Sequence, residues 1–210
     1  MANIIPTILT SDLKKAQLQI NSLGNLVELI QLDLMDGKFV EAVSINPEEV
    51  QQLTSAVSLE AHLMVADPAS WLPYLSPELF KRVYMHIEAL PEPETFILQA
   101  KDIGFEVGLA IKLETLLSAI ENYAEMVDSV LFMSVEPGAQ GRLFKPEVLE
   151  KIDNFLNQFP SHLIAIDGGV NEYNIQEVAK VGVENISVGS AIFANGQIEN
   201  NLKKLKELIT

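Results

Sequence analysis

Positions 31, 33 and 35 alternate within one apolar run, IQLDLMDG. An extended strand sends residues two apart to the same face, so Gln31, Asp33 and Met35 are predicted to point together. A carboxylate that faces an apolar interior needs a cation or strong hydrogen-bond donors beside it. A turn-capping role is the alternative for Asp33, but Asp36-Gly37 already supplies the turn chemistry. Asp33 is therefore the candidate functional carboxylate of this run.

A histidine and a second aspartate occupy comparable places in other apolar runs. His62 lies within AHLMV, and Asp167 ends IAID. A lone histidine in an apolar strand is usually a hydrogen-bonded core residue. Together with Asp33 and Asp167 at equivalent depths, however, one imidazole and two carboxylates suffice to hold a divalent ion. We expect a mostly structural role for His86, in YMHIEA, and none in the site for His162.

Glycines gather at three further strand ends, in VEPGAQG, IDGGV and VGSAIF. Glycine lets the backbone approach a ligand closely and donate its N–H groups. Tight turns are the alternative explanation for any one of these segments. Their occurrence on the last two strands in succession favours the phosphate position common in barrels of this type.

The elements that must position these residues form a repeat. Eight apolar runs begin near Ile4, Val27, Val57, Arg82, Glu106, Val127, His162 and Asn185. Amphipathic segments follow them, such as DLKKAQLQINSL, PEPETFILQAKDI, PEVLEKIDNFLNQF and NEYNIQEVAKVG. Runs that are apolar at nearly every position indicate a parallel sheet covered on both faces, and eight βα units close a barrel. We predict an α/β fold, a single (β/α)8 TIM barrel domain over residues 1–210, with a doubly wound open sheet as the alternative.

Composition excludes several classes of function. The formal net charge of −15 disfavours nucleic acid and anionic membranes as partners. It would also repel a small anion, so a phosphate ligand must rely on local backbone N–H groups. The chain has no cysteine, which excludes disulfides and thiolate chemistry and favours a reducing cytosol. No targeting or membrane-spanning segment is predicted, so we expect a cytoplasmic protein.

Eight segments, in this order, resemble the ribulose-phosphate 3-epimerase family: PTIL, LDLMDGKFV, HLM, HIEA, VGLAIK, MSVEPG, IDGGV and GSAIF. The resemblance runs from about Ile4 to about Phe193. It implies a ribulose-phosphate-binding barrel that inverts the C3 centre of a ketose phosphate, such as D-ribulose 5-phosphate, by metal-assisted two-base proton transfer. The expected ligand is a small phosphorylated sugar, and a homo-oligomer remains open.

The resemblance also implies roles for individual residues. Asp33 and Asp167 match the family's acid–base pair, and Asp33, His62 and Asp167 match its metal ligands. The metal would be zinc, iron, manganese or cobalt. The resemblance assigns substrate or phosphate contacts to Thr7, Met35, His62, Met64, Met133, Gly138, Gly141, Gly168, Gly169, Gly189 and Ser190.

Three departures from the family pattern bear on activity. Gln31 replaces a metal-ligating histidine, and a neutral amide oxygen is the weaker ligand for zinc-like metals. Glu41-Ala42 replaces a Pro-Asn pair, and the phosphate loop becomes PGAQGRL, in which Arg142 is a candidate phosphate contact. These changes leave a catalytically impaired sugar-phosphate-binding paralogue as the alternative function. A decarboxylase or lyase would need a lysine between aspartates inside the barrel, and Lys38 is not placed there.

Overall fold

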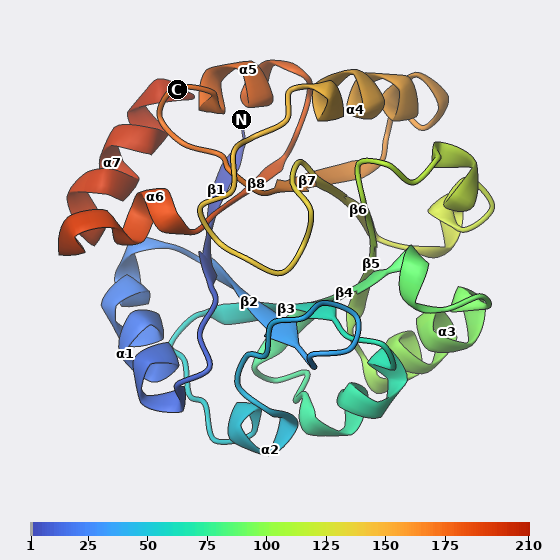
Figure 1. Ribbon diagram of the computed structural model, residues 1–210, viewed down its shortest axis with the longest axis horizontal. Coiled ribbons are helices and arrows are strands. Elements are labelled where there is room, and N and C mark those ends of the chain that lie inside the picture. Colours follow the sequence, from blue (N-terminus) through green and yellow to red (C-terminus); the bar gives the residue numbers. More distant parts are fainter. Residues whose placement is uncertain (1) are drawn as a thin grey trace.

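Eight parallel strands form a closed barrel in the computed structural model, which describes residues 2–210 (Figure 1). Each strand pairs with its sequence neighbours, and β8 returns to pair with β1. The strands are β1 (Asn3–Ile8), β2 (Leu29–Met35), β3 (Ser58–Met64), β4 (Phe80–His86), β5 (Glu106–Ile111), β6 (Ser129–Met133), β7 (Leu163–Asp167) and β8 (Asn185–Val188). The predicted barrel is confirmed, and the alternative of an open sheet is wrong.

Helices surround this barrel (Figure 1). The α-helices are α1 (Leu13–Leu23), α2 (Pro47–Val50), α3 (Pro93–Ile103), α4 (Glu147–Gln158), α5 (Ile175–Lys180), α6 (Ser190–Phe193) and α7 (Ile198–Leu208). Short 3-10 turns are η1 (Gly24–Leu26), η2 (Pro68–Tyr74), η3 (Ile87–Ala89), η4 (Leu117–Ala119), η5 (Ala124–Met126) and η6 (Ala194–Gly196). The described residues contain no helix with the length and apolar character needed to cross a bilayer.

The helix boundaries have local causes. The Asp12 side chain accepts hydrogen bonds from the backbone N–H groups of Lys14 and Lys15 and so begins α1. Gly104, in the left-handed conformation, ends α3. Nearly every strand residue is buried, since one face meets the helices and the other fills the barrel.

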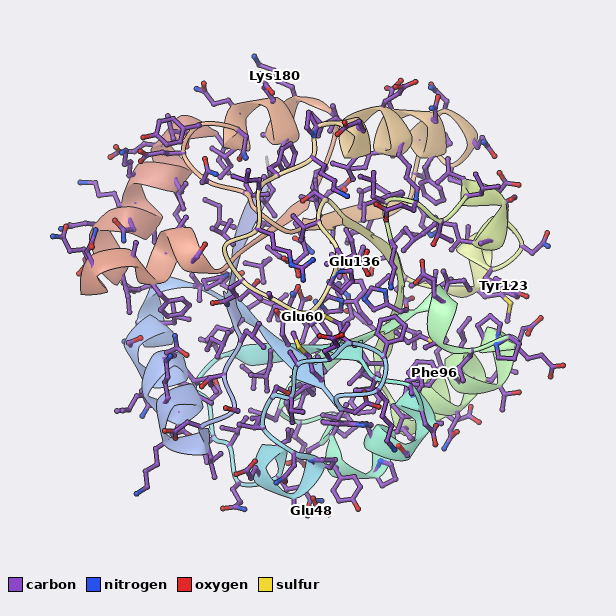
Figure 2. All side chains as sticks on the ribbon, in the orientation of Figure 1. Glu48, Glu60, Phe96, Tyr123, Glu136 and Lys180 are labelled. Atoms are coloured by element: carbon purple, nitrogen blue, oxygen red, sulfur yellow. The ribbon has the colours of Figure 1, made fainter. Side chains whose placement is uncertain are left out.

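A layer of polar side chains crosses the barrel below the site. The Arg82 guanidinium lies 3.1 Å from the Glu60 carboxylate and 2.5 Å from that of Glu106. Figure 2 labels Glu60 near the barrel axis in projection, whereas Glu48 and Lys180 lie at the periphery. Because ionised groups inside a barrel must be paired, this cluster lets side chains of the neighbouring strands β3, β4 and β5 offset one another's charges.

The strand register carries the candidate residues to one end of the barrel. Asp33 pairs with His62 and Met35 with Met64 in the β2–β3 register, while Met133 pairs with Asp167 between β6 and β7. These are the carboxyl ends of the strands, where barrels of this architecture place their ligands.

Candidate active site

A narrow pocket opens at the carboxyl ends of the strands. The loop between β6 and α4 reaches over this mouth of the barrel (Figure 1). The fold brings nearly all of the predicted site residues together in the lining of the pocket. They are Thr7, Asp33, Met35, Met64, Met133, Gly138, Gly141, Asp167, Gly168, Gly169, Gly189 and Ser190. His62 lies fully buried beneath it.

Two carboxylates and one imidazole meet at the floor of the pocket. The Nδ1 atom of His62 lies 3.1 Å from an oxygen of Asp33 and 3.4 Å from an oxygen of Asp167. Each of the three residues offers a ligand atom, and these atoms all lie within 4.8 Å of one another. This donor set fits a divalent cation, because carboxylate oxygens with one imidazole nitrogen are ordinary ligands of zinc, manganese and iron.

Gln31 lies inside the same cluster. Its amide nitrogen donates to Asp33 at 2.9 Å and to Asp167 at 2.7 Å. Its amide oxygen accepts a hydrogen bond of 2.7 Å from the hydroxyl of Ser187 on β8. A hydroxyl can also accept, so Ser187 would satisfy the amide in either orientation. Gln31 can therefore present nitrogen to free carboxylates or oxygen to a cation.

The cluster shifts the pKa values of His62 and Asp33. Burial alone would lower the pKa of His62, but the hydrogen bonds and charges of Asp167 and Asp33 raise it to about 9. Burial raises the pKa of Asp33, and the charge of Asp167 adds to this effect, against the lowering influence of His62. The site therefore favours an imidazolium between carboxylates, one of which holds a proton more readily than usual.

A chain of polar groups extends from His62 away from the pocket. The Nε2 atoms of His62 and His86 lie 2.9 Å apart, and Nδ1 of His86 lies 3.2 Å from an oxygen of Glu88. The other oxygen of Glu88 accepts from the backbone N–H of Lys112 and the hydroxyl of Thr115. Sequence reasoning gave His86 a structural role and missed Glu88. The HIEA motif, with polar residues two apart at a strand end, was the available signal.

The pKa values of His86 and Glu88 are shifted as well. Burial lowers the pKa of His86 to about 4, with the positive charge of His62 adding to it. Burial would raise the pKa of Glu88, but its hydrogen bonds from His86, Thr115 and the Lys112 backbone lower it to about 2.

The β6–α4 loop lies against the glycines of the rim. A Cβ added at Gly169 would lie 2.6–2.9 Å from backbone atoms of Phe144 and Arg142, and one at Gly189 would lie 2.8 Å from the amide of Gln140. The Gln140 amide nitrogen also lies 3.4 Å from the carbonyl oxygen of Thr7. A side chain at position 169 would thus force the loop backbone away, whereas at position 189 only the end of the Gln140 side chain would have to move.

Two basic residues lie outside the pocket. Arg142 and Lys38 are both exposed, and within the described chain neither lysine nor arginine lines the cavity. His162 packs against the rings of Phe155 and Phe159 and does not line the pocket.

Comparison with known families places this geometry in context. Residues 3–193 match the family model described as the ribulose-phosphate 3 epimerase family. A ribulose-phosphate 3-epimerase of Aquifex aeolicus is 33% identical, with 100% of this chain and 97% of that protein covered. A protein of the same name from Helicobacter pylori is 31% identical, with 90% of each chain covered.

Solved structures confirm the fold. KGPDC from Streptococcus mutans superimposes with a TM-score of 0.78 at 14% identity and covers 99% of this chain and 97% of its own. The 3-hexulose-6-phosphate synthase from Salmonella typhimurium gives a TM-score of 0.73 at 16% identity, with 98% and 97% covered. Both likenesses concern the barrel architecture alone.

Proposed function

Because the chain belongs to the ribulose-phosphate 3-epimerase family, we propose that it interconverts D-ribulose 5-phosphate and D-xylulose 5-phosphate, or a related pair of ketose phosphates, by inverting C3. The observation that carries this proposal is the pair of buried carboxylates, Asp33 and Asp167, at the floor of a pocket lined by glycines. Inversion needs one acid–base group on each face of the reacting carbon.

The two carboxylates can divide this work. Asp33 projects from β2 and Asp167 from β7, so they reach the pocket floor from different sides of the barrel. One takes the proton from C3, and the other returns a proton to the opposite face. The raised pKa of Asp33 suits this exchange, since a carboxyl group closer to neutrality both accepts and releases a proton more effectively.

Asp33, His62 and Asp167 would hold the divalent ion, with the amide oxygen of Gln31 as a fourth ligand. Such an ion, zinc, iron, manganese or cobalt, supplies positive charge beside the oxygen on which negative charge develops. The protein's own contribution is to bring two carboxylates and an imidazole nitrogen to one buried point.

The remaining lining would position the sugar phosphate. Met35, Met64 and Met133 surround the pocket floor with adaptable apolar surface against the reacting carbon. The hydroxyl of Thr7 would contact the sugar. The phosphate would be held by backbone N–H groups of the loops that carry Gly138, Gly141, Gly168, Gly169, Gly189 and Ser190. The absence of lysine and arginine from the described lining supports binding by the backbone.

Turnover of D-ribulose 5-phosphate to D-xylulose 5-phosphate by the purified, metal-supplemented protein tests the proposal. We expect Asp33→Asn and Asp167→Asn each to abolish turnover, since each removes the base from one face. Glu114→Asn, at an exposed carboxylate, is the control and should retain it. Absence of turnover with every metal tested would instead favour the impaired, sugar-phosphate-binding paralogue.

A further inference from the structure

We propose that His86 and Glu88 are positioning residues that fix the tautomer of His62, so that its Nδ1 lone pair faces Asp33 and Asp167. The inference rests on the metal site of the proposed function and adds two residues outside that ligand set. It follows from which group must donate and which must accept in the hydrogen bonds that link Glu88, His86 and His62.

Glu88 determines which atoms donate in these hydrogen bonds, because it can only accept. One of its oxygens accepts from the backbone N–H of Lys112 at 2.9 Å and from the hydroxyl of Thr115 at 2.5 Å. Its other oxygen lies 3.2 Å from Nδ1 of His86. A carboxylate is purely an acceptor when ionised, and the surrounding groups here are donors. The proton of this last hydrogen bond therefore belongs to Nδ1 of His86.

The next link follows from the ring of His86. A neutral imidazole with its proton on Nδ1 has a lone pair on Nε2. This Nε2 lies 2.9 Å from Nε2 of His62, so the proton between the rings must belong to His62. The neutral form of His62 then has its lone pair on Nδ1, which lies 3.1 Å from Asp33 and 3.4 Å from Asp167. A metal at that point needs this lone pair.

Packing holds the imidazole rings of His62 and His86 in place. Both imidazoles are fully buried, and the ring of Phe39 lies against that of His86 with 4.9 Å between centroids. The ammonium of Lys112 lies 4.9 Å from the centroid of the same Phe39 ring. A half-turn of either ring would put carbon where nitrogen now lies and would break its hydrogen bonds, and the close packing of these buried rings opposes such a turn.

Glu88→Gln is a direct test because the amide would reverse the donor and acceptor roles along the row of hydrogen bonds from position 88 to His62. Two donors, from Lys112 and Thr115, would keep the amide oxygen on their side and turn its NH2 group toward His86. That group donates, so His86 must accept on Nδ1 and carry its proton on Nε2. His62 would then accept on Nε2 and carry its proton on Nδ1, facing the aspartates in the place of a metal. We expect zinc affinity to fall about 10- to 100-fold, the usual effect of removing an outer partner of a metal-binding histidine.

Two measurements decide the matter without using turnover. Zinc affinity is determined by chelator competition for the wild type, Glu88→Gln and the matched control Glu114→Gln, which removes an exposed carboxylate of the neighbouring loop. Ring-nitrogen NMR of histidine labelled with nitrogen-15 gives the tautomers directly, and with three histidines in the chain His162 serves as an internal reference.

In the zinc-loaded wild type we expect protons on Nδ1 of His86 and Nε2 of His62, and a move of the His86 proton to Nε2 in Glu88→Gln. A wild-type proton on Nε2 of His86, or equal zinc affinity for Glu88→Gln and Glu114→Gln, would overturn the proposal. If Glu88→Gln does not fold, the wild-type spectrum still decides. Protein with these tautomers but no epimerase turnover would refute the proposed function and leave this inference standing.

Discussion

At the scale of single residues, Gln31 stands where the sequence resemblance leads us to expect a metal-ligating histidine. Its amide nitrogen donates to both aspartates, at 2.9 and 2.7 Å. The amide thereby offsets the repulsion between two buried carboxylates through hydrogen bonds rather than charge. Binding a cation requires the amide to turn its oxygen inward, and that oxygen is a weaker ligand than an imidazole nitrogen for zinc.

We therefore predict that Gln31→His tightens zinc binding by about tenfold or more, which corresponds to ~1.4 kcal/mol per decade. Chelator competition measures the change. Ser187→Ala, which removes the hydroxyl partner of Gln31 without adding a ligand, is the comparison and should not tighten binding. An unchanged or lower zinc affinity in Gln31→His would show that position 31 does not reach the metal.

Much of the site could be predicted from single residues. Asp33, His62 and Asp167 stand in apolar runs, where period-two alternation and the cost of burying charge identify them. The contacts of Gln31 and His86 could not be predicted, because they depend on the register between strands. A shift of one residue would turn these side chains to the other face.

At the scale of elements, Gly108 on β5 makes room for a neighbouring strand's side chain. A Cβ at this position would lie 2.2 Å from ring atoms of Tyr84, which is fully buried on β4. We predict that Gly108→Ala destabilises the protein by about 1–3 kcal/mol, the usual cost of overpacking a core. Urea unfolding measures it. Ala110→Gly on the same strand is the control, at about 0.5–1 kcal/mol; a Gly108→Ala protein as stable as the wild type would contradict the packing argument.

The start of α6 is the element that we expect to bind phosphate through its backbone. Ser190→Pro removes the N–H group at a position where proline suits a helix, whereas Ser190→Ala removes the hydroxyl alone. We predict that the proline variant weakens competitive inhibition by inorganic phosphate about 10- to 100-fold, since a hydrogen bond to a charged group contributes about 1.5–3 kcal/mol. Equal inhibition constants for the two variants would argue against backbone binding at this position.

Glu88 links the end of β4 to the segment after β5, and its lowered pKa makes this link depend on pH. Its pKa falls from 4.5 to about 2 on folding, so its stabilising effect is complete above about pH 4.5 and is lost as the pH falls toward 2. We predict that the wild type exceeds Glu88→Gln in free energy of unfolding at neutral pH, and that the difference shrinks across this range. Denaturation at several pH values measures it, and a difference independent of pH would refute the assignment.

The elements could be predicted to different degrees. The observed strands begin within two residues of the predicted starts, because each apolar run has a clear beginning. The segment between β5 and β6 departs from the expected helical repeat and forms only the turns η4 and η5. Its carbonyls at Lys112, Leu113 and Thr115 are bound instead by the ammonium of Lys151 on α4. This long-range contact has no signature in the local sequence.

At the scale of the whole molecule, the formal net charge is −15, and we propose that the pocket binds a phosphorylated sugar. The overall field opposes the approach of an anion, and screening by salt should weaken this repulsion. Glycines from several strand ends line one mouth of the barrel, and we expect their backbone N–H groups to offset this repulsion locally.

Wash-in of solvent deuterium at C3 tests the central claim most directly. In D2O with added divalent metal, we predict that wild-type protein incorporates deuterium into D-ribulose 5-phosphate and into D-xylulose 5-phosphate, because either aspartate can exchange its proton with solvent between turnovers. Asp33→Asn and Asp167→Asn should not support inversion from either epimer. Incorporation together with inversion in the wild type, and loss of inversion in both variants, would support two-base epimerisation, and absence of incorporation from the wild type with every metal tested would contradict it.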